Sequence, residues 1–180
     1  MTDALTGPRP GEDSLDAVWQ RVLASGPDAP CVSGSGLAWT RRDFEQAIQA
    51  QAAAWSAEGV EPGDVVAWLG LNTAPMLAAL FACARLGAVF LPLNWRLTDE
   101  ELRQVLFHAQ ALRVTGGAEM ADRLTALSQA GPAGAAGAGQ GGGPRPTPKT
   151  LPGDLLLVYT SGTTGQPKGA VHTHTQVLAN

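Results

Sequence analysis

The sequence has few charged side chains, and lysine is especially scarce. Among its 180 residues 16% are charged, with 16 acidic and 12 basic side chains, and the lysines are Lys149 and Lys168 alone. A net charge of −4 offers no basic surface for nucleic acid or anionic lipid, so neither is expected as a partner. The apolar fraction of 44% is nevertheless too high for a disordered chain. These proportions predict a globular protein of one or two domains.

Cysteine is also rare, and its placement predicts no disulfide or metal site. Cys31 and Cys83 stand far apart and form no CxxC motif. The three histidines, His108, His172 and His174, lack ligand spacing with either cysteine. We therefore expect two reduced thiols and no zinc site.

Long uninterrupted hydrophobic runs are absent. The first 16 residues contain acids, prolines and glycines without an apolar stretch, so no signal peptide is expected. The most apolar stretch, residues 75–93, is interrupted by Arg85, Gly87 and Pro92. This pattern predicts a buried helix followed by a buried strand, not a transmembrane segment. We expect a soluble, cytoplasmic protein.

The hydrophobic pattern predicts helices and a hairpin first, then alternating strands and helices. Ser14 and Thr40 are the expected N-caps of two helices, with a hairpin formed by residues 31–32 and 37–39 between them. Strands are then predicted at residues 64–69, 88–91 (closed by Pro92) and 112–115, and helices at 73–86, from Thr98, and at 118–127. Continuous apolar strands between helices are typical of a parallel sheet covered on both faces. The predicted fold class is therefore α/β.

Composition divides the chain into four parts. Residues 1–13 are expected to be disordered, and residues 14–130 form an N-terminal α/β portion. Residues 131–152 are rich in Gly, Ala and Pro, which neither bury apolar area nor sustain a helix, so a flexible connection is expected. Residues 153–180 begin with an apolar strand and end as a helix opens.

The segment after that last strand carries the chemistry. It reads Thr160-Ser161-Gly162-Thr163-Thr164-Gly165-Gln166-Pro167-Lys168-Gly169. Glycines allow backbone N–H groups to approach an anion closely, and hydroxyl groups add donors for phosphate oxygens. A lysine adds a point charge, which suits a phosphate group that moves or leaves. The residues therefore predict a phosphate-binding loop.

Other interpretations of this loop are less well supported. A Walker A loop needs Gly directly before its lysine and Ser or Thr directly after it, whereas Pro167 precedes Lys168 and Gly169 follows. No GxGxxG follows a predicted strand, so a dinucleotide-binding fold has no support. A polar turn between two strands, without a ligand, is the alternative that the residues leave open.

Residues 157–168 resemble the AMP-binding signature of the acyl-adenylate-forming superfamily. The superfamily includes acyl-CoA synthetases, luciferases and peptide-synthetase adenylation domains. All twelve positions of the signature fit: an apolar residue, two free positions, Thr-Ser-Gly-Thr-Thr-Gly, a free position, Pro and Lys. Residues 62–67, Asn72, 87–94 and 97–102 are similar to the family's first α/β subdomain, whereas residues 131–152 are unmatched. The implied fold is a partial N-terminal subdomain, incomplete at the C-terminus.

One segment distinguishes between branches of the superfamily. Pro92 to Leu102 resembles the Pro-Leu-Asn-x-Arg-Leu-Thr-x-x-Glu-Leu of acyl-CoA synthetases. Peptide-synthetase adenylation domains usually have Asp-Pro after the Pro-Leu, where this chain has Asn94-Trp95. The likeness favours the N-terminal part of a carboxylic acid–CoA ligase, with a fatty acid as the expected substrate. An adenylation domain is the alternative branch.

The resemblance also implies a reaction and a set of site residues. In family enzymes a carboxylate attacks the α-phosphate of Mg-ATP, giving an acyl-adenylate and pyrophosphate, and coenzyme A then displaces AMP. ATP, Mg²⁺ and coenzyme A are the implied cofactors, and a small carboxylic acid is the implied substrate. Lys168 is the implied catalytic residue. The implied ATP-phosphate contacts are Thr160, Ser161, Gly162, Thr163, Thr164, Gly165 and Lys168.

Other functional elements of the family lie beyond this loop in its longer members. They are the adenine and ribose contacts, the magnesium-binding glutamate, the hinge and a C-terminal catalytic lysine, and none can be assigned here. We therefore expect the chain to be inactive alone and to leave apolar faces uncovered. A non-catalytic nucleotide-binding remnant and a partner subunit that completes a sheet are two alternative functions.

Three further residues could belong to the site, one after the loop and two after the predicted strand at residues 88–91. His174 either caps or packs at the next helix or lies near the nucleotide or acyl pocket. Asn94 and Arg96 are expected to be turn and surface residues.

Overall fold

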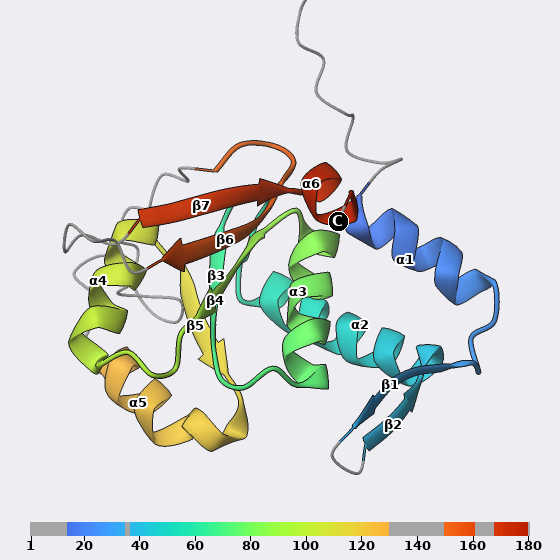
Figure 1. Ribbon diagram of the computed structural model, residues 1–180, viewed down its shortest axis with the longest axis horizontal. Coiled ribbons are helices and arrows are strands. Elements are labelled where there is room, and N and C mark those ends of the chain that lie inside the picture. The colour runs from blue at the N-terminus through green and yellow to red at the C-terminus, as the bar shows by residue number, and fades with distance from the viewer. Residues whose placement is uncertain (1–13, 35–36, 130–149, 161–167, 180) are drawn as a thin grey trace, which may run out of the picture.

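A five-stranded sheet forms the centre of the fold (Figure 1). The computed structural model describes residues 14–34, 37–129, 150–160 and 168–179. The strands lie in the order β5-β3-β4-β6-β7; the first four are parallel, and β7 is antiparallel to β6. Their bounds are Val65–Leu69 for β3, Val89–Leu93 for β4, Arg113–Gly116 for β5, Asp154–Thr160 for β6 and Lys168–Thr173 for β7. The predicted α/β class with a largely parallel sheet is confirmed.

Helices cover both faces of this sheet, as predicted (Figure 1). Helices α1, α2 and α3 pack on one face, and α4 and α5 pack on the other. The helix bounds are Leu15–Ala24 for α1, Arg41–Ala57 for α2, Ala74–Leu86 for α3, Asp99–Ala109 for α4, Ala121–Gln129 for α5 and His174–Leu178 for α6. A 3₁₀ turn at Ala118–Met120 leads into α5, where the sequence predicts one continuous helix.

Strand alternation divides the core into two apolar clusters. Val66 and Trp68 of β3 point to the α1–α3 face, where they pack with Trp55 of α2. Ala67, between them in the chain, points to the opposite face and packs with Leu102 of α4. Because successive side chains of a strand point to opposite faces, a strand that is apolar throughout is buried on both sides.

The predicted caps and the hairpin are present. The side chain of Ser14 accepts a hydrogen bond at the start of α1, and those of Thr40 and Thr98 do so in capping boxes with Asp43 and Glu101. Strands β1 (Pro30–Gly34) and β2 (Leu37–Thr40) form a separate antiparallel hairpin beside α2. Local side-chain hydrogen bonds therefore fix these helix starts.

The prediction that Pro92 closes its strand is wrong, because β4 continues to Leu93. The N–H of Val89 donates to the carbonyl of Asp64 on the β3 side, so odd-numbered residues of β4 bond toward β3. The nitrogen of Pro92 therefore faces β6. Because it faces away from β3, the missing N–H of proline costs no bond to that strand. On the other side, β4 pairs with β6 at Phe90 and Leu156.

Charged side chains join the three helices of one face. The guanidinium of Arg85 on α3 lies 2.9 Å from a carboxylate oxygen of Asp16 on α1 and 2.9 Å from one of Glu45 on α2. The indole N–H of Trp19 donates to Glu45 at 2.8 Å. Burial opposes ionisation of Glu45, but the hydrogen bonds from Arg85 and Trp19 outweigh it and lower the pKa of this carboxyl. We call these four residues the Arg85 cluster.

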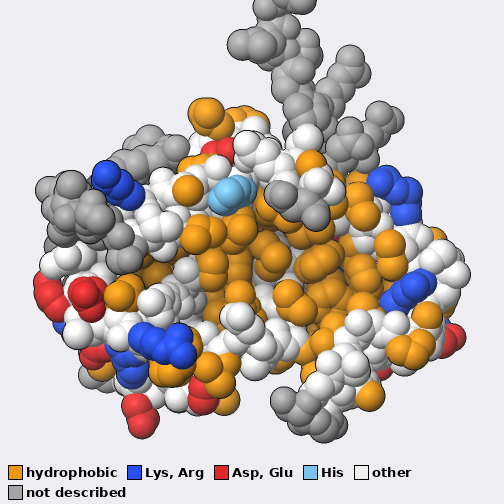
Figure 2. All heavy atoms as spheres, viewed as in Figure 1, with side chains coloured by type: hydrophobic (Ala, Val, Ile, Leu, Met, Phe, Trp, Pro, Cys, Tyr) orange, Lys and Arg blue, Asp and Glu red, His pale blue; other side chains and the backbone are white. Residues whose placement is uncertain are grey.

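An apolar surface remains uncovered on one side of the molecule. Figure 2 shows hydrophobic side chains gathered over α3 and beside β6. On α3, Leu77 is 42% exposed, and Met76, Leu80 and Phe81 are half-buried. The expectation of an uncovered apolar face is thus confirmed for the described residues. No helix among them is both long and apolar enough to cross a membrane.

Two predicted segments lie largely outside the described residues. They are the disordered start at residues 1–13 and most of the flexible connection at residues 131–152. The division of the chain into these parts stays a prediction. Thr150 and Leu151 are described at the end of the connection, where the N–H of Leu151 donates to the carboxylate of Asp154 at 2.7 Å.

Candidate functional site

The candidate site lies where β6 ends and β7 begins. Thr160 is the last residue of β6, Lys168 is the first residue of β7, and the two are directly paired across the antiparallel ladder. In open α/β sheets, ligands bind outside the carboxyl ends of the parallel strands, and Thr160 occupies such an end. The structure therefore brings the first and last predicted phosphate contacts together.

The remaining predicted contacts are not located by the structure. Ser161, Gly162, Thr163, Thr164 and Gly165 lie outside the described residues. Their role stays a prediction based on the signature.

Thr160 and Lys168 are both exposed, so their side chains are accessible to a ligand. Within the described part of the chain, no carboxylate forms an ion pair with Lys168. The strand β7 itself was missed by the sequence analysis. Its residues Gly169 and His172 obscure the apolar alternation that indicates a strand, and its pairing with β6 is a tertiary feature.

A tyrosine and a histidine beside the site were also missed. The hydroxyl of Tyr159, the residue before Thr160, lies 2.6 Å from Nδ1 of His108 on α4. The ring of Tyr159 also lies over Gly169, since a Cβ atom at that glycine would come within 3.1 Å of Tyr159 Cζ. Burial raises the pKa of Tyr159 above its ordinary value, which keeps the hydroxyl protonated. In the sequence, no spacing connects residues 108 and 159.

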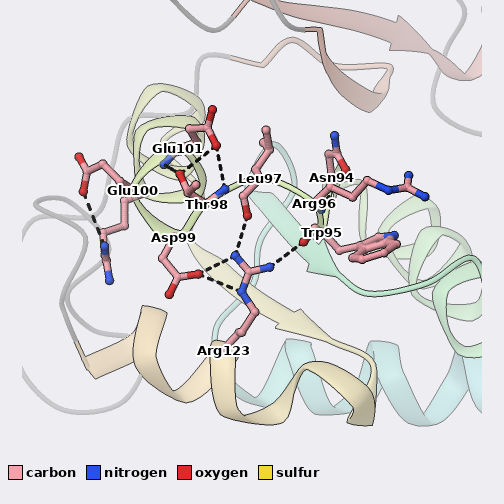
Figure 3. Close-up of polar contacts among 10 residues, drawn as sticks. Asn94, Trp95, Arg96, Leu97, Thr98, Asp99, Glu100, Glu101 and Arg123 are labelled. Atoms are coloured by element: carbon pink, nitrogen blue, oxygen red, sulfur yellow. Dashed lines mark hydrogen bonds and ion pairs between the residues drawn. The ribbon is translucent and has the colours of Figure 1, made fainter.

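The turn after β4 lies on the same edge of the sheet and is fixed by Arg123 of α5 (Figure 3). The Arg123 guanidinium donates to the carbonyls of Trp95 at 2.6 Å and Leu97 at 2.7 Å. It also pairs with Asp99, the first residue of α4, at 2.6 Å. One side chain therefore satisfies two turn carbonyls and holds α4 against α5.

Asn94 and Arg96 are turn and surface residues, as predicted. The side-chain oxygen of Asn94 accepts from the backbone N–H of Arg96 at 3.1 Å, which is a local turn contact. The Arg96 guanidinium lies 4.6 Å from the centre of the Trp95 ring. Both side chains are exposed, and Figure 3 shows them pointing away from Arg123.

His174 has a structural contact at the start of α6. Its Nδ1 accepts a hydrogen bond from the N–H of Leu15, the first residue of α1, at 3.1 Å. The side chain is half-buried. Burial lowers the pKa of His174 below its ordinary value, although the nearby carboxylate of Asp16 opposes this shift. The structure thus supports the packing role that the sequence left open.

We expect the attachment of α1 to weaken in acid because Nδ1 of His174 accepts only when unprotonated. The pKa of His174 in the folded state lies below its unfolded value of about 6.5. Between these two pKa values the unfolded chain therefore binds more protons than the folded chain. The stabilisation is therefore complete above about pH 6.5 and is lost as pH falls through the folded pKa. Urea unfolding from pH 5 to 8 measures this dependence.

The matched control for this pH series is His174→Asn. Its amide oxygen can accept from Leu15, and it does not titrate. The other two histidines stay in place, so their contribution cancels in the comparison. Equal pH dependence in the parent and the variant would contradict the assigned role of His174.

The described residues contain no group of three or more His, Cys, Asp or Glu side chains that could hold a metal ion. The cysteines are free thiols: Cys31 is exposed and Cys83 is buried. Mg²⁺ therefore has no carboxylate cluster within this part of the chain.

Comparisons with known proteins assign the fold and the loop to one family. The profile described as AMP-binding enzyme matches residues 19–180. Feruloyl-CoA synthase from Amycolatopsis is 40% identical over 158 residues, covering 86% of this chain and 32% of that protein. Indoleacetate–CoA ligase from Aromatoleum aromaticum is 40% identical over 146 residues, covering 69% of this chain and 28% of that protein.

A solved structure shows the same fold. A putative long-chain-fatty-acid–CoA ligase from Rhodopseudomonas palustris superposes with a TM-score of 0.74 at 26% identity, covering 92% of this chain and 46% of that one. The chain belongs to the AMP-binding enzyme family. It spans about a third of the length of these two curated relatives.

Proposed function

We propose that the chain provides the phosphate-binding part of an ATP-dependent carboxylic acid–CoA ligase. The reaction would join a carboxylate to AMP with release of pyrophosphate, and then transfer the acyl group to coenzyme A. The observation that carries this proposal is the pairing of Thr160 with Lys168 at the carboxyl edge of the sheet. The pairing sits within a chain that matches AMP-binding enzymes along residues 19–180.

The proposed role of Lys168 is electrostatic. Negative charge grows on the departing pyrophosphate as the carboxylate attacks, and a fixed cation lowers the energy of that charge. The hydroxyl of Thr160 would donate a hydrogen bond to a phosphate oxygen. We propose the same contact for Ser161, Thr163 and Thr164, and backbone N–H contacts at Gly162 and Gly165.

We propose Mg²⁺ and coenzyme A as cofactors because enzymes of the family use them. Mg²⁺ usually keeps several waters and is held by one or two carboxylates together with the phosphates of its substrate. The two free thiols are consistent with a reducing compartment, and we propose the cytoplasm.

The proposed substrate is a small carboxylic acid. Two relatives at 40% identity are named for ferulate and indoleacetate, both aromatic acids, and the superposed structure is named for long-chain fatty acids. An aromatic acid and a fatty acid are therefore the two classes to compare.

A chimera tests the proposal directly. Residues 19–180 would replace the matching segment of the Amycolatopsis feruloyl-CoA synthase, and acyl-adenylate would be trapped with hydroxylamine in the presence of MgATP. We expect hydroxamate formation with ferulate because the graft supplies a competent phosphate loop. The unaltered synthase is the control, and indoleacetate and a long-chain fatty acid are the comparison substrates.

Two outcomes would contradict this account. A folded chimera that forms no hydroxamate with any of these acids would show that the loop does not support adenylation. Hydroxamate formation by the 180-residue chain alone would overturn the expectation that it is inactive by itself. Binding of MgATP without adenylation by the chimera would favour the nucleotide-binding alternative.

A further inference from the structure

Tyr159 connects the two strands of the site to helix α4. Its hydroxyl is hydrogen-bonded to Nδ1 of His108 at 2.6 Å, and the two rings are nearly perpendicular, with centroids 5.7 Å apart and an angle of 88°. Its ring covers Gly169, its direct partner on β7. One side chain therefore contacts β6, β7 and α4 at once.

The position of this side chain relative to the site is set by strand geometry. The pair Tyr159–Gly169 is immediately followed by the pair Thr160–Lys168. Because successive side chains of a strand point to opposite faces, Thr160 and Lys168 point away from the face that Tyr159 shares with α4. Tyr159 would thus affect a ligand through the backbone of the two strands and not by contact.

The β7 strand needs such a support more than the inner strands do. It lies at the edge of the sheet, with one neighbour, β6. Glycine weakens a strand because it has no side chain to pack, and an aromatic ring from the facing strand compensates for this. His108 fixes the orientation of that ring, and α4 is itself held against α5 by the ion pair between Asp99 and Arg123.

We propose that the hydrogen-bonded pair Tyr159–His108 is a positioning device that holds Thr160 and Lys168 at the separation required to bind phosphate. The inference rests on the proposed function, since it assumes that these two residues contact the phosphates of ATP. It assigns to His108, an exposed residue on helix α4, a role that no sequence motif indicates.

Calorimetric titration of the full 180-residue chain tests the inference, with inorganic pyrophosphate and MgATP as probes. Tyr159→Phe removes the hydroxyl and keeps the ring over Gly169. We expect its pyrophosphate affinity to fall by about fivefold, the size of effect that loss of one hydrogen bond produces. In a Lys168→Ala background the same change should have a smaller effect, because one of the two residues that the pair positions is then absent.

Three further measurements separate positioning from general stability. His108→Ala should weaken pyrophosphate binding as Tyr159→Phe does, and His108→Asn should restore it, because an amide group can replace Nδ1 as hydrogen-bond partner. Thr98→Ala removes the cap at the other end of α4, so it should lower stability without changing the affinity. The chain has one tyrosine, so a single ¹³Cζ resonance should shift in His108→Ala.

The outcomes distinguish failure of this inference from failure of the proposed function. If the parent chain binds neither pyrophosphate nor MgATP, the proposed phosphate site is wrong and the inference is overturned with it. If the parent binds and Tyr159→Phe binds equally well, the inference alone is overturned. A loss of affinity in Thr98→Ala as large as that in Tyr159→Phe would also overturn it, because stability would then explain both.

Discussion

Replacing Lys168 with alanine in the feruloyl-CoA synthase chimera is expected to slow adenylation by about 10²- to 10³-fold, the usual cost of removing one charge-stabilising group from a transition state. The KM for the carboxylic acid should change little, because Lys168 would face the departing pyrophosphate and not the acid. Single-turnover formation of the adenylate, trapped as the hydroxamate, measures the rate of this step.

The scarcity of lysine provides a matched control for this experiment. Lys149 is the other lysine in the sequence, and it belongs to the connection that composition predicts to be solvated. Lys149→Ala should therefore leave the adenylation rate unchanged, while Lys168→Arg should recover part of it by restoring the charge with a different geometry. Equal rates in Lys168→Ala and the parent chimera would remove Lys168 from the mechanism.

Local signals in the sequence were sufficient to predict most of the fold. The threonines at positions 40 and 98 each precede an acidic residue by three positions, and both pairs form the expected capping boxes. The strand 65–69 is apolar throughout, and it lies between two layers of helices. Such features depend on residues close together in the chain, so composition and periodicity reveal them.

The features that were missed depend on residues far apart in the chain. Pro92 continues its strand because its nitrogen faces β6, and that orientation is decided by which neighbour each residue bonds to. The edge strand β7 exists because it pairs with β6, although Gly169 makes its own sequence a weak strand former.

The candidate site likewise combines residues that the sequence could predict with a contact that it could not. Its first and last residues, Thr160 and Lys168, could be named from the signature, since the chemistry is encoded in consecutive positions. The contact between Tyr159 and His108 joins residues 51 positions apart and has no sequence pattern. The residues that hold the site in place were therefore accessible only from the structure.

The Arg85 cluster gives the largest expected effect on stability. Arg85 is 20% exposed, and its partners Asp16 and Glu45 are 24% and 10% exposed. Arg85→Met keeps most of the side-chain volume but leaves two carboxylates without their cation. We expect the free energy of unfolding to fall by about 3 kcal/mol, the lower end of the range for breaking a buried ion pair, because the cluster is partly exposed. Urea unfolding of the 180-residue chain measures this loss.

The comparison variant is Arg42→Met, which removes the ion pair with Asp28. Those side chains are 54% and 78% exposed, so the loss should stay below about 1 kcal/mol. The same substitution thus removes one cation from a sheltered site and one from a solvated site. If both variants lose equal stability, the Arg85 cluster would not be what fastens α1 and α2 to α3. A large loss for Arg85→Met alone would show that the N-terminal helix depends on a charge 69 positions away from Asp16.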